Sequence, residues 1–566
     1  MRLTMEPNQG VLVVFADRSS EMPELLEDNL TEIAEIQASD EGILVRGFSD
    51  LSGRKSFLAT LAGQRFKGEA RIDPPPGTLA LDGLWRFSLE PTMDNRWGDF
   101  RYPAAPDFIG AEARRFKYMT EGETPGSGLG WYRKEFSDAA WPEHTYTYGP
   151  YWWDSGLLKE AQVIDEFLQN ALHGEIDPER WSWYHYSQKF GSEDKEVHNA
   201  DAQGLFGVSD SFLVFDETGS SKDSVRYLFT YIGSDRDREM ILDFGGRELY
   251  PRVAWVNGIK VLSIDREAET RLSESNNGRL NPGAKVELRE EATAKIVLKK
   301  GSNPVLLEIT HPGGQRIWTY AAFYEPGRPP ATERFVPLLK WSRENAAIRH
   351  DIFPEAAKRV GWYRFEAPPG TKSMTLHLIA RSVEAWVDGD PVEVNGDTIT
   401  LVSRKERVSQ VAVRIEHEPG RYGGAAFEQP VSFDCESGLI ALGDWCDHAL
   451  RSYSGAGVYR TTFQISPDRL EGKAVLDLGR VNSTAEVTAN GKSVGIRMAS
   501  PYTFDLSRLL KEGENAIEVR VHNTLANHYD VGYPSKWVHD GQTLSGLIGP
   551  ANIRFLREVV LHRDPA

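Results

Sequence analysis

The stretch AWVNGIKV at Ala254–Val261 returns as AWVDGDPV at Ala385–Val392 and, more loosely, as VTANGKSV at Val487–Val494. In each copy, strand-forming residues lead into an Asn-Gly or Asp-Gly pair. Such pairs tolerate positive φ at both central positions of a type I′ turn, which makes them the strongest short signal for a β-hairpin. The sequence therefore predicts three hairpins built on one plan.

The similarity between the copies extends well beyond the hairpins. An alternating aromatic strand begins each longer copy, at Tyr227, Trp362 and Val458. Downstream, KKGSNPVLLEIT at Lys299–Thr310 matches KEGENAIEVRVHN at Lys511–Asn523. Alternation of apolar and polar residues is typical of strands with one buried face. Because strand follows strand without intervening helices, we predict an all-β fold of tandem jelly-roll β-sandwiches.

A chain of 566 residues is too long for a single hydrophobic core, and the repeats indicate where it divides. We expect a small β-rich domain at residues 1–76, a β-sandwich at 77–328 with a long insertion at about 92–220, a second β-sandwich at 329–434, and a C-terminal β-sandwich at 435–566. The breaker DPPPG at Asp73–Gly77 ends the first of these units.

The insertion contains the one convincing helical pattern, and the sequence offers no catalytic barrel. Apolar residues recur at helical spacing within Gly156–Gly174, and Gly174 is expected to end the helix as its C-cap. A (β/α)₈ barrel needs about 250 residues of alternating strands and helices. Since the sequence does not supply such a pattern, we expect one helical insertion and no barrel.

Charge and hydropathy argue against two classes of partner. With 65 basic and 83 acidic residues the chain has a net charge of −18, which would repel nucleic acid. Its apolar runs fall short of the roughly 18 residues needed to span a membrane. The first residues lack the pattern of a secretory signal, so a cytoplasmic location is expected if Met1 is the natural start.

Two cysteines, Cys435 and Cys446, lie eleven residues apart. A disulfide between them is possible, but two free thiols are favoured, because a chain of this size does not need such a crosslink. No metal site is predicted, since the sequence lacks a matching cluster of His and Cys residues.

The sandwich motifs resemble accessory domains of glycoside hydrolases. LDGLWRFSLEP at Leu81–Pro91 resembles the opening of the sugar-binding, galactose-binding-like β-sandwich of family 2 enzymes. The segments Leu442–Ile465 and Ser545–Ile553 are similar to the C-terminal sandwich of family 106 enzymes, the bacterial α-L-rhamnosidases. Leu89–Phe116 also resembles the accessory region of those enzymes. These motifs are architectural, since they specify a sandwich and its hairpins.

The resemblance implies the non-catalytic β-sandwich portion or subunit of a rhamnosidase-like glycoside hydrolase that acts on plant or microbial glycans. The catalytic barrel would belong to an upstream domain or a separate chain. The two catalytic carboxylates and the calcium site of the family belong to that barrel, so no catalytic residue and no calcium ligand is assigned. Two alternatives stay open: an independent carbohydrate-binding protein, and a stand-alone glycoside hydrolase with an unidentified carboxylate pair.

A dense aromatic cluster is the first candidate carbohydrate-binding site. Its candidate sugar-contacting residues are Trp152, Trp153, Trp181, Trp183 and Tyr184. Aromatic faces stack on the C–H faces of sugars, and binding clefts are usually apolar with a few placed polar groups. The alternative, which we favour, is that these rings pin the insertion onto its sandwich.

The second candidate is the segment Val521–Gly541, which follows a strand and is expected to form a long loop at one end of a sandwich. Loops in such positions often carry binding residues. Its candidate ligand-facing residues are Asn527, His528, Tyr529 and Trp537. The favoured alternative is that the loop packs on itself through the turn chemistry of its Asn and Asp residues.

Overall fold

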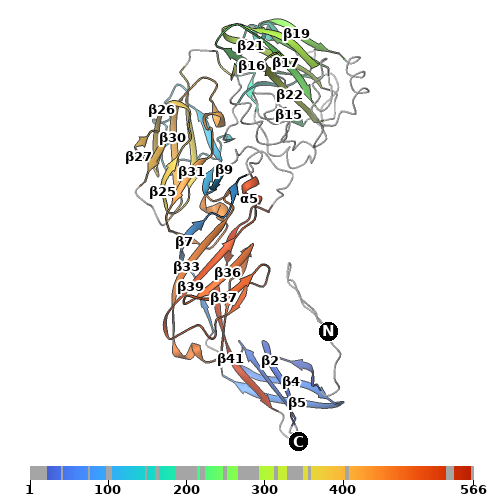
Figure 1. Cartoon of the computed structure of the whole chain (residues 1–566), viewed down its shortest axis with the longest axis vertical. Coiled ribbons are helices and arrows are strands. Elements are labelled where there is room, and N and C mark those ends of the chain that lie inside the picture. Colours follow the sequence, from blue (N-terminus) through green and yellow to red (C-terminus); the bar gives the residue numbers. More distant parts are fainter. Residues whose placement is uncertain are drawn as a thin grey trace.

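Three antiparallel β-sandwiches and a smaller N-terminal unit form an elongated molecule in the computed structural model (Figure 1). The structure describes residues 22–39, 42–73, 77–96, 105–146, 150–159, 165–184, 213–216, 224–246, 251–265, 292–311, 316–327, 348–354, 358–401, 407–530 and 541–562. The all-β prediction is confirmed. Within these ranges the helices are α1 (Asp165–Leu172), α5 (Ala526–Tyr529) and the 3-10 helices η3 (Gly423–Ala426), η4 (Trp445–His448) and η5 (Pro467–Leu470).

The three predicted hairpins form as expected. They join β18 (Arg252–Val256) to β19 (Ile259–Ile264), β26 (Ala380–Val387) to β27 (Asp390–Val392), and β36 (Thr484–Ala489) to β37 (Lys492–Arg497). In every turn both central residues have positive φ, from 49° at Asn490 to 91° at Gly389. These are the dihedral angles that a type I′ turn requires, so the Asn-Gly and Asp-Gly pairs explain the turns.

The first sandwich packs a seven-stranded sheet against a four-stranded one. The larger sheet contains β14 (Ser182–Trp183), β13 (Trp153–Lys159), β16 (Ser224–Ser234), β21 (Gly301–His311), β18 and β19, with β23 (Ile348–Asp351) paired to β16. The smaller contains β15 (Leu213–Asp216), β22 (Arg316–Tyr324), β17 (Arg238–Gly246) and β20 (Thr293–Leu298). Leu228 and Leu307 of the larger sheet meet Leu242 and Phe244 of the smaller in a fully buried core.

The helix of the insertion is shorter than predicted. We expected it over Gly156–Gly174, but α1 begins only at Asp165. Leu157 and Leu158 belong instead to β13, where their backbone pairs with β16. Local helical spacing was therefore overridden by a long-range strand partner. The end of the helix was predicted correctly, because Gly174 follows α1 with a φ of +84°.

The second sandwich combines a five-stranded and a six-stranded sheet. The first contains β10 (Ala111–Ala113), β31 (Val431–Cys435), β25 (Thr371–Thr375), β29 (Thr398–Thr400) and β28 (Val394–Asn395). The second contains β12 (Glu143–Thr145), β11 (Arg115–Thr120), β24 (Val360–Ala367), β30 (Ser409–His417), β26 and β27. Residues near 110–145, expected inside the insertion of the first sandwich, therefore contribute strands to the second.

The C-terminal sandwich recruits a strand from far upstream. Its six-stranded sheet has the order β32 (Gly438–Ala441), β7 (Leu84–Glu90), β33 (Ala456–Ile465), β39 (Gly513–His522), β36 and β37. We expected Leu84–Glu90 to open the sandwich that ends near residue 328, but β7 pairs with β32 and β33. Two small two-stranded sheets pair β35 (Arg480–Asn482) with β40 (Gly546–Gly549) and β8 (Asp94–Asn95) with β9 (Ala105–Phe108). The domain ranges as a whole remain a prediction.

The N-terminal unit shares a sheet with the other end of the chain. Its three-stranded sheet is β1 (Glu24–Asp28), β4 (Gly53–Leu61) and β5 (Gln64–Ile72). The neighbouring sheet runs β2 (Glu32–Ser39), β3 (Gly42–Ser49), β41 (Asn552–His562), β34 (Lys473–Asp477) and β38 (Thr503–Asp505), with β6 (Thr78–Ala80) on β41. The long strand β41 therefore connects the N-terminal unit to the C-terminal sandwich, as the lower part of Figure 1 shows.

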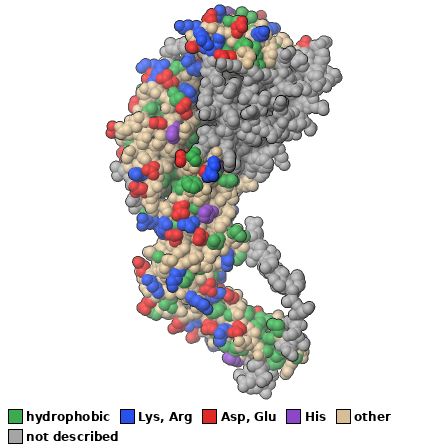
Figure 2. Space-filling model, in the orientation of Figure 1, with side chains coloured by type: hydrophobic (Ala, Val, Ile, Leu, Met, Phe, Trp, Pro, Cys, Tyr) green, Lys and Arg blue, Asp and Glu red, His purple; other side chains and the backbone are tan. Residues whose placement is uncertain are grey.

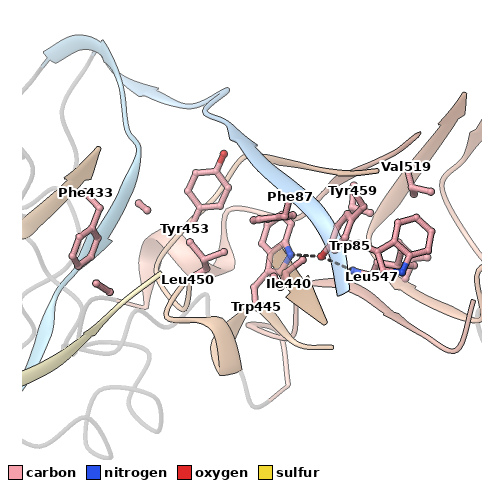
Figure 3. Packing of buried hydrophobic residues seen from close by; sticks show 14 of the residues in the cluster. Trp85, Phe87, Phe433, Ile440, Trp445, Leu450, Tyr453, Tyr459, Val519 and Leu547 are labelled. Carbon is pink, nitrogen blue, oxygen red and sulfur yellow. Dashed lines mark hydrogen bonds between the residues drawn. The ribbon is translucent and has the colours of Figure 1, made fainter. Parts of the chain in front are cut away.

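One continuous hydrophobic core joins the second and C-terminal sandwiches. Around β7, the aromatic rings of Phe87, Trp445 and Tyr459 pack together (Figure 3). The buried Tyr459 hydroxyl accepts hydrogen bonds from the Trp445 indole N–H at 2.6 Å and from the Leu547 backbone N–H at 3.2 Å. Trp445 is fully buried.

Other sequence expectations can be compared with the described residues. Cys435 and Cys446 are both free, as favoured. No described helix is both long and apolar enough to cross a membrane. On the face shown in Figure 2, basic and acidic side chains are intermixed along the molecule.

The shared strand β7 leads to a stability prediction. Phe87→Ala removes a buried ring from β7, and such truncations cost about 3–5 kcal/mol of unfolding free energy. We expect faster hydrogen exchange in peptides from β33 and β39, more than 350 residues away in sequence. Leu84→Ala is the matched control, because this exposed residue of the same strand should change stability by about 0.5 kcal/mol or less. Exchange that rises only near residues 77–96 would contradict the assignment of β7.

Candidate functional site

Trp152, which immediately precedes β13, and Trp153, its first residue, lie in separate hydrophobic cores. Trp152 is fully buried and packs against the His350 ring at 5.4 Å between centroids. Trp153 points to the opposite face of the sheet, where its indole N–H donates to the backbone oxygen of Ile352 at 2.6 Å. Adjacent residues of a strand point to opposite faces, which explains this division.

The other three aromatic candidates are also packed against protein. Trp181 stacks on Phe167 of α1 with centroids 5.2 Å apart. Tyr184 is buried beside Phe215 of the smaller sheet of the first sandwich. Trp183 is half-buried and lies 6.0 Å from Tyr118 of the second sandwich, so it bridges the two sandwiches. These faces are covered by other side chains, which supports the packing alternative over an open cleft.

Asn527 occupies the centre of a buried hydrogen-bond network. Its side-chain N–H groups donate to the backbone oxygens of Arg451 and Thr543, each at 2.8 Å. Its side-chain oxygen accepts from the hydroxyl of Ser545 at 2.8 Å and from the amide of Asn523 at 3.1 Å. With no exposed surface and four partners, Asn527 holds the segment to its own sandwich rather than facing a ligand.

Of the other three candidates in this segment, the structure describes the side chain of His528 but not those of Tyr529 and Trp537. His528 is buried, and its backbone oxygen and ring nitrogen both contact the guanidinium of Arg114. The backbone of Tyr529 ends α5, but its side chain lies outside the description. Trp537 falls within residues 531–540 and also lies outside the described residues. The candidate loop therefore has two members whose binding role stays a prediction.

A polar cavity of about 260 Å³ lies beside α5, at the junction of the second and C-terminal sandwiches. We call it the junction cavity. Its lining comes from β10, β11, β12, β24 and the segment after η4, and includes Glu112, Arg115, Lys117, Glu143, Glu366, Cys446, Arg451, Ser452 and Asp530. Segments about 415 residues apart in sequence meet here, since Arg115 pairs with Asp530.

Ion pairs determine the electrostatics of the junction cavity. The Asp530 carboxylate accepts from Arg115 and, at 2.9 Å, from Arg451. Burial lowers the pKa of Arg115, against the opposing charges of Asp530 and Glu143. Burial also acts to lower the pKa of Arg451, but the charge and hydrogen bond of Asp530 outweigh it and raise that pKa. Loss of contact with water raises the pKa of Glu366, and nearby carboxylates add to the effect.

These contacts favour a structural role for most carboxylates of the junction cavity. Glu112 pairs with the buried Arg114 at 2.9 Å, and Glu143 pairs with Arg115 at 3.5 Å. Asp530 is held by two guanidinium groups. A glycosidase needs one carboxyl group that donates a proton and another that acts as base or nucleophile. The carboxylates of Glu112, Glu143 and Asp530 are instead engaged by arginine, which suits them to hold the surrounding segments together.

Sequence reasoning missed Arg115 and Arg451, which fix the candidate segment from outside. Their partner Asp530 lies within the loop that was singled out, whereas the two arginines lie in segments that were recognised only for their architecture. Only the pairing of β11 with the second sandwich brings Arg115 to this position. Across the described residues, no group of three or more His, Cys, Asp or Glu side chains is placed to hold a metal ion.

Comparison with known families identifies the class of the C-terminal sandwich. Residues 452–551 match the family described as glycosyl hydrolase 2 galactose-binding domain-like. A putative beta-glucuronidase of Formosa agariphila is 40% identical over 83 residues, which are 14% of this chain and 7% of that protein. A beta-glucuronidase of the same organism is 32% identical over 91 residues, 16% of this chain and 9% of that protein. The chain thus spans less than a tenth of these relatives and contains glycoside-hydrolase-related β-sandwich domains.

Solved structures give partial alignments. A rhamnosidase from Novosphingobium sp. PP1Y aligns over 36% of this chain and 22% of its own, with 21% identity and a TM-score of 0.18. A beta-glucuronidase from an uncultured Clostridium sp. aligns over 23% and 24%, with 18% identity and a TM-score of 0.17.

The hydrogen-bond network around Asn527 leads to a prediction about the stability of the protein. Asn527→Ala would leave buried donors and acceptors unpaired, each at a cost of about 1–3 kcal/mol, so we expect a clear loss of unfolding free energy in urea. The matched control is Leu525→Ala, an exposed position two residues earlier. If Asn527 served only a ligand, the variant would be as stable as the control.

The burial of His350 leads to a prediction about how stability depends on pH. Neither of its ring nitrogens has a hydrogen-bond partner among the described residues, and burial lowers its pKa to about 3 from 6.5. The folded state therefore prefers the neutral ring, and this stability is complete above about pH 6.5 and declines as the pH falls toward 3. The slope should reach about 1.4 kcal/mol per pH unit.

The test is urea unfolding between pH 7.5 and 4.5. We expect His350→Phe to weaken the acid-side loss of stability, and His173→Gln, at an exposed position of the same region, to leave it unchanged. An equal slope in the wild type and in His350→Phe would contradict the assignment.

Proposed function

We propose that this chain is the non-catalytic β-sandwich portion or subunit of a rhamnosidase-like glycoside hydrolase acting on plant or microbial glycans. A barrel on another domain or chain would supply the catalytic carboxylates. The match of residues 452–551 to a galactose-binding-like family of glycoside hydrolases supports the enzyme class. The names of the curated relatives leave the sugar open, since each is matched over less than a tenth of its length.

The observation that carries the non-catalytic part of the proposal is the state of the carboxylates in the junction cavity. Glu112, Glu143 and Asp530 are each paired with arginine. Glu366 has a raised pKa, as a proton donor requires. The second carboxylate that catalysis needs would have to come from Glu112, Glu143 or Asp530, and each of these is paired with arginine. The continuous core between the second and C-terminal sandwiches gives the pair the rigidity of a scaffold rather than the mobility of linked modules.

Two alternatives are separable by experiment. An independent carbohydrate-binding protein would bind glycans with no catalytic partner in the cell. A stand-alone hydrolase would need a carboxylate pair, and Glu366 with Asp530 is the pair that the junction cavity would offer.

The decisive measurement is chromophore release from a panel of aryl glycosides. The purified chain alone should release no chromophore from α-L-rhamnosides, β-D-glucuronides, β-D-galactosides or β-D-mannosides. Adding the product of a neighbouring barrel-encoding reading frame should restore turnover and co-purify with the chain. Release by the chain alone, lost in both Glu366→Gln and Asp530→Asn but retained in Glu436→Gln, would replace the proposal with the stand-alone hydrolase.

A further inference from the structure

The outer face of the six-stranded sheet in the C-terminal sandwich contains a groove of about 570 Å³. We call it the sheet groove. Strand register places five of its lining residues in one row, because Leu439 pairs with Arg86, Arg86 with Arg460, Arg460 with Glu518, and Glu518 with Thr488. Side chains of a strand alternate between faces, so this row points away from the core that holds Trp85, Phe87 and Tyr459.

The row is long enough for an extended ligand. Neighbouring strands lie about 4.8 Å apart, so a row across β32, β7, β33, β39 and β36 measures about 19 Å. That length is several times the width of one six-membered sugar ring. The volume of the groove also lies within the range of ordinary ligand sites. Its shape therefore suits a chain that crosses the strands.

The chemistry of the sheet groove suits a polyhydroxylated ligand. Arg460 donates to Glu518 at 2.7 Å and to the hydroxyl of Ser88 at 3.0 Å. Both charged side chains stay partly exposed, at 40% and 32%. Arg86 donates to the hydroxyl of Ser437 at 3.0 Å. A guanidinium has five hydrogen-bond donors, and a carboxylate accepts several hydrogen bonds. The row can therefore both donate hydrogen bonds to ligand hydroxyl groups and accept hydrogen bonds from them.

The same residues disfavour other classes of ligand. Glu518 lies beside Arg460 in the row and pairs with it, and the whole chain carries a net charge of −18, which opposes a polyanion. The polar centre opposes an apolar partner, because its charged groups would be desolvated without new hydrogen bonds.

At one end, Leu84 is 52% exposed and lies beside the half-buried Leu439, which offers apolar surface to the C–H face of a sugar. The floor is a hydrogen-bonded sheet, so little order has to be gained on binding.

We propose that the sheet groove binds a neutral glycan as an extended chain lying across the strands, in preference to a single sugar. The choice of carbohydrate as the ligand class rests on the proposed function. The site is distinct from the junction cavity, whose charged groups belong to other elements.

The experiment is isothermal titration of the full chain with neutral linear hexasaccharides of glucose, mannose, xylose and galactose, and with the four monosaccharides. We expect at least one hexasaccharide to bind at least tenfold more tightly than its monosaccharide. Arg460→Gln should weaken that binding at least tenfold, and Thr488→Val should weaken it several-fold. The matched controls are Arg520→Gln and Thr484→Val, which lie on the same strands and the same face of the sheet but do not line the groove, and should bind as the wild type.

Four outcomes would overturn the inference. They are no binding of any hexasaccharide, equal binding of monosaccharides, tighter binding of an acidic oligogalacturonide hexasaccharide, or wild-type binding by Arg460→Gln and Thr488→Val. Equal thermal unfolding midpoints of variants and controls would show that lost binding does not reflect lost folding. Failure here leaves the aryl-glycoside result unchanged, and release of chromophore by the chain alone would leave the groove result unchanged, so the two proposals fail separately.

Discussion

A buried asparagine near the start of a long central strand sets the register of two of the three sandwiches. Asn303 and Asn515 each accept from a backbone N–H four residues earlier, donate to two nearby carbonyls, and contact the asparagine of the type I′ turn at 2.8 Å. Each asparagine is almost fully buried, so a shifted pairing would leave several polar groups unsatisfied. Because a slip of one residue exchanges the two faces of a strand, this contact also decides which side chains form the core and which face outward.

Local chemistry explains why the hairpins and the all-β class could be predicted from sequence. A turn such as Asn490–Gly491 depends on four consecutive residues, and all of its information is adjacent. The partner of a strand is a different kind of information. Alternation in Leu84–Glu90 shows that one face is buried, but it does not say that the partner begins at Ala456. For the same reason the predicted helix was too long. The pairing of β13 with β16 overrode the helical pattern at its start.

Residue type alone did not distinguish binding residues from core residues, whereas strand register shows which side chains share an outer face. Trp152 and Trp181 drew attention because aromatic rings serve both cores and binding sites, and burial alone distinguishes the two uses. Arg86, Arg460 and Glu518 looked like ordinary outward-facing strand residues. They become a row only when β7 is inserted beside β33, which is a consequence of the fold and not of any motif. The network of Asn527 was similarly hidden, since its partners come from three separate segments.

The pairing of β3 with β41 also constrains how the chain can be made. Ribosomes add about 5–20 residues per second, so β41 emerges roughly 25–100 s after β3 has left the exit tunnel. For that time one edge of β3 has no partner, and open strand edges are sites of aggregation. Exposed charged residues on β3 and its neighbour β2, such as Arg46 and Glu35, are of the kind that discourages pairing between chains at an open edge. Folding of the N-terminal unit is therefore completed only after translation of the last strand, and a nascent chain of this protein depends on remaining soluble while incomplete.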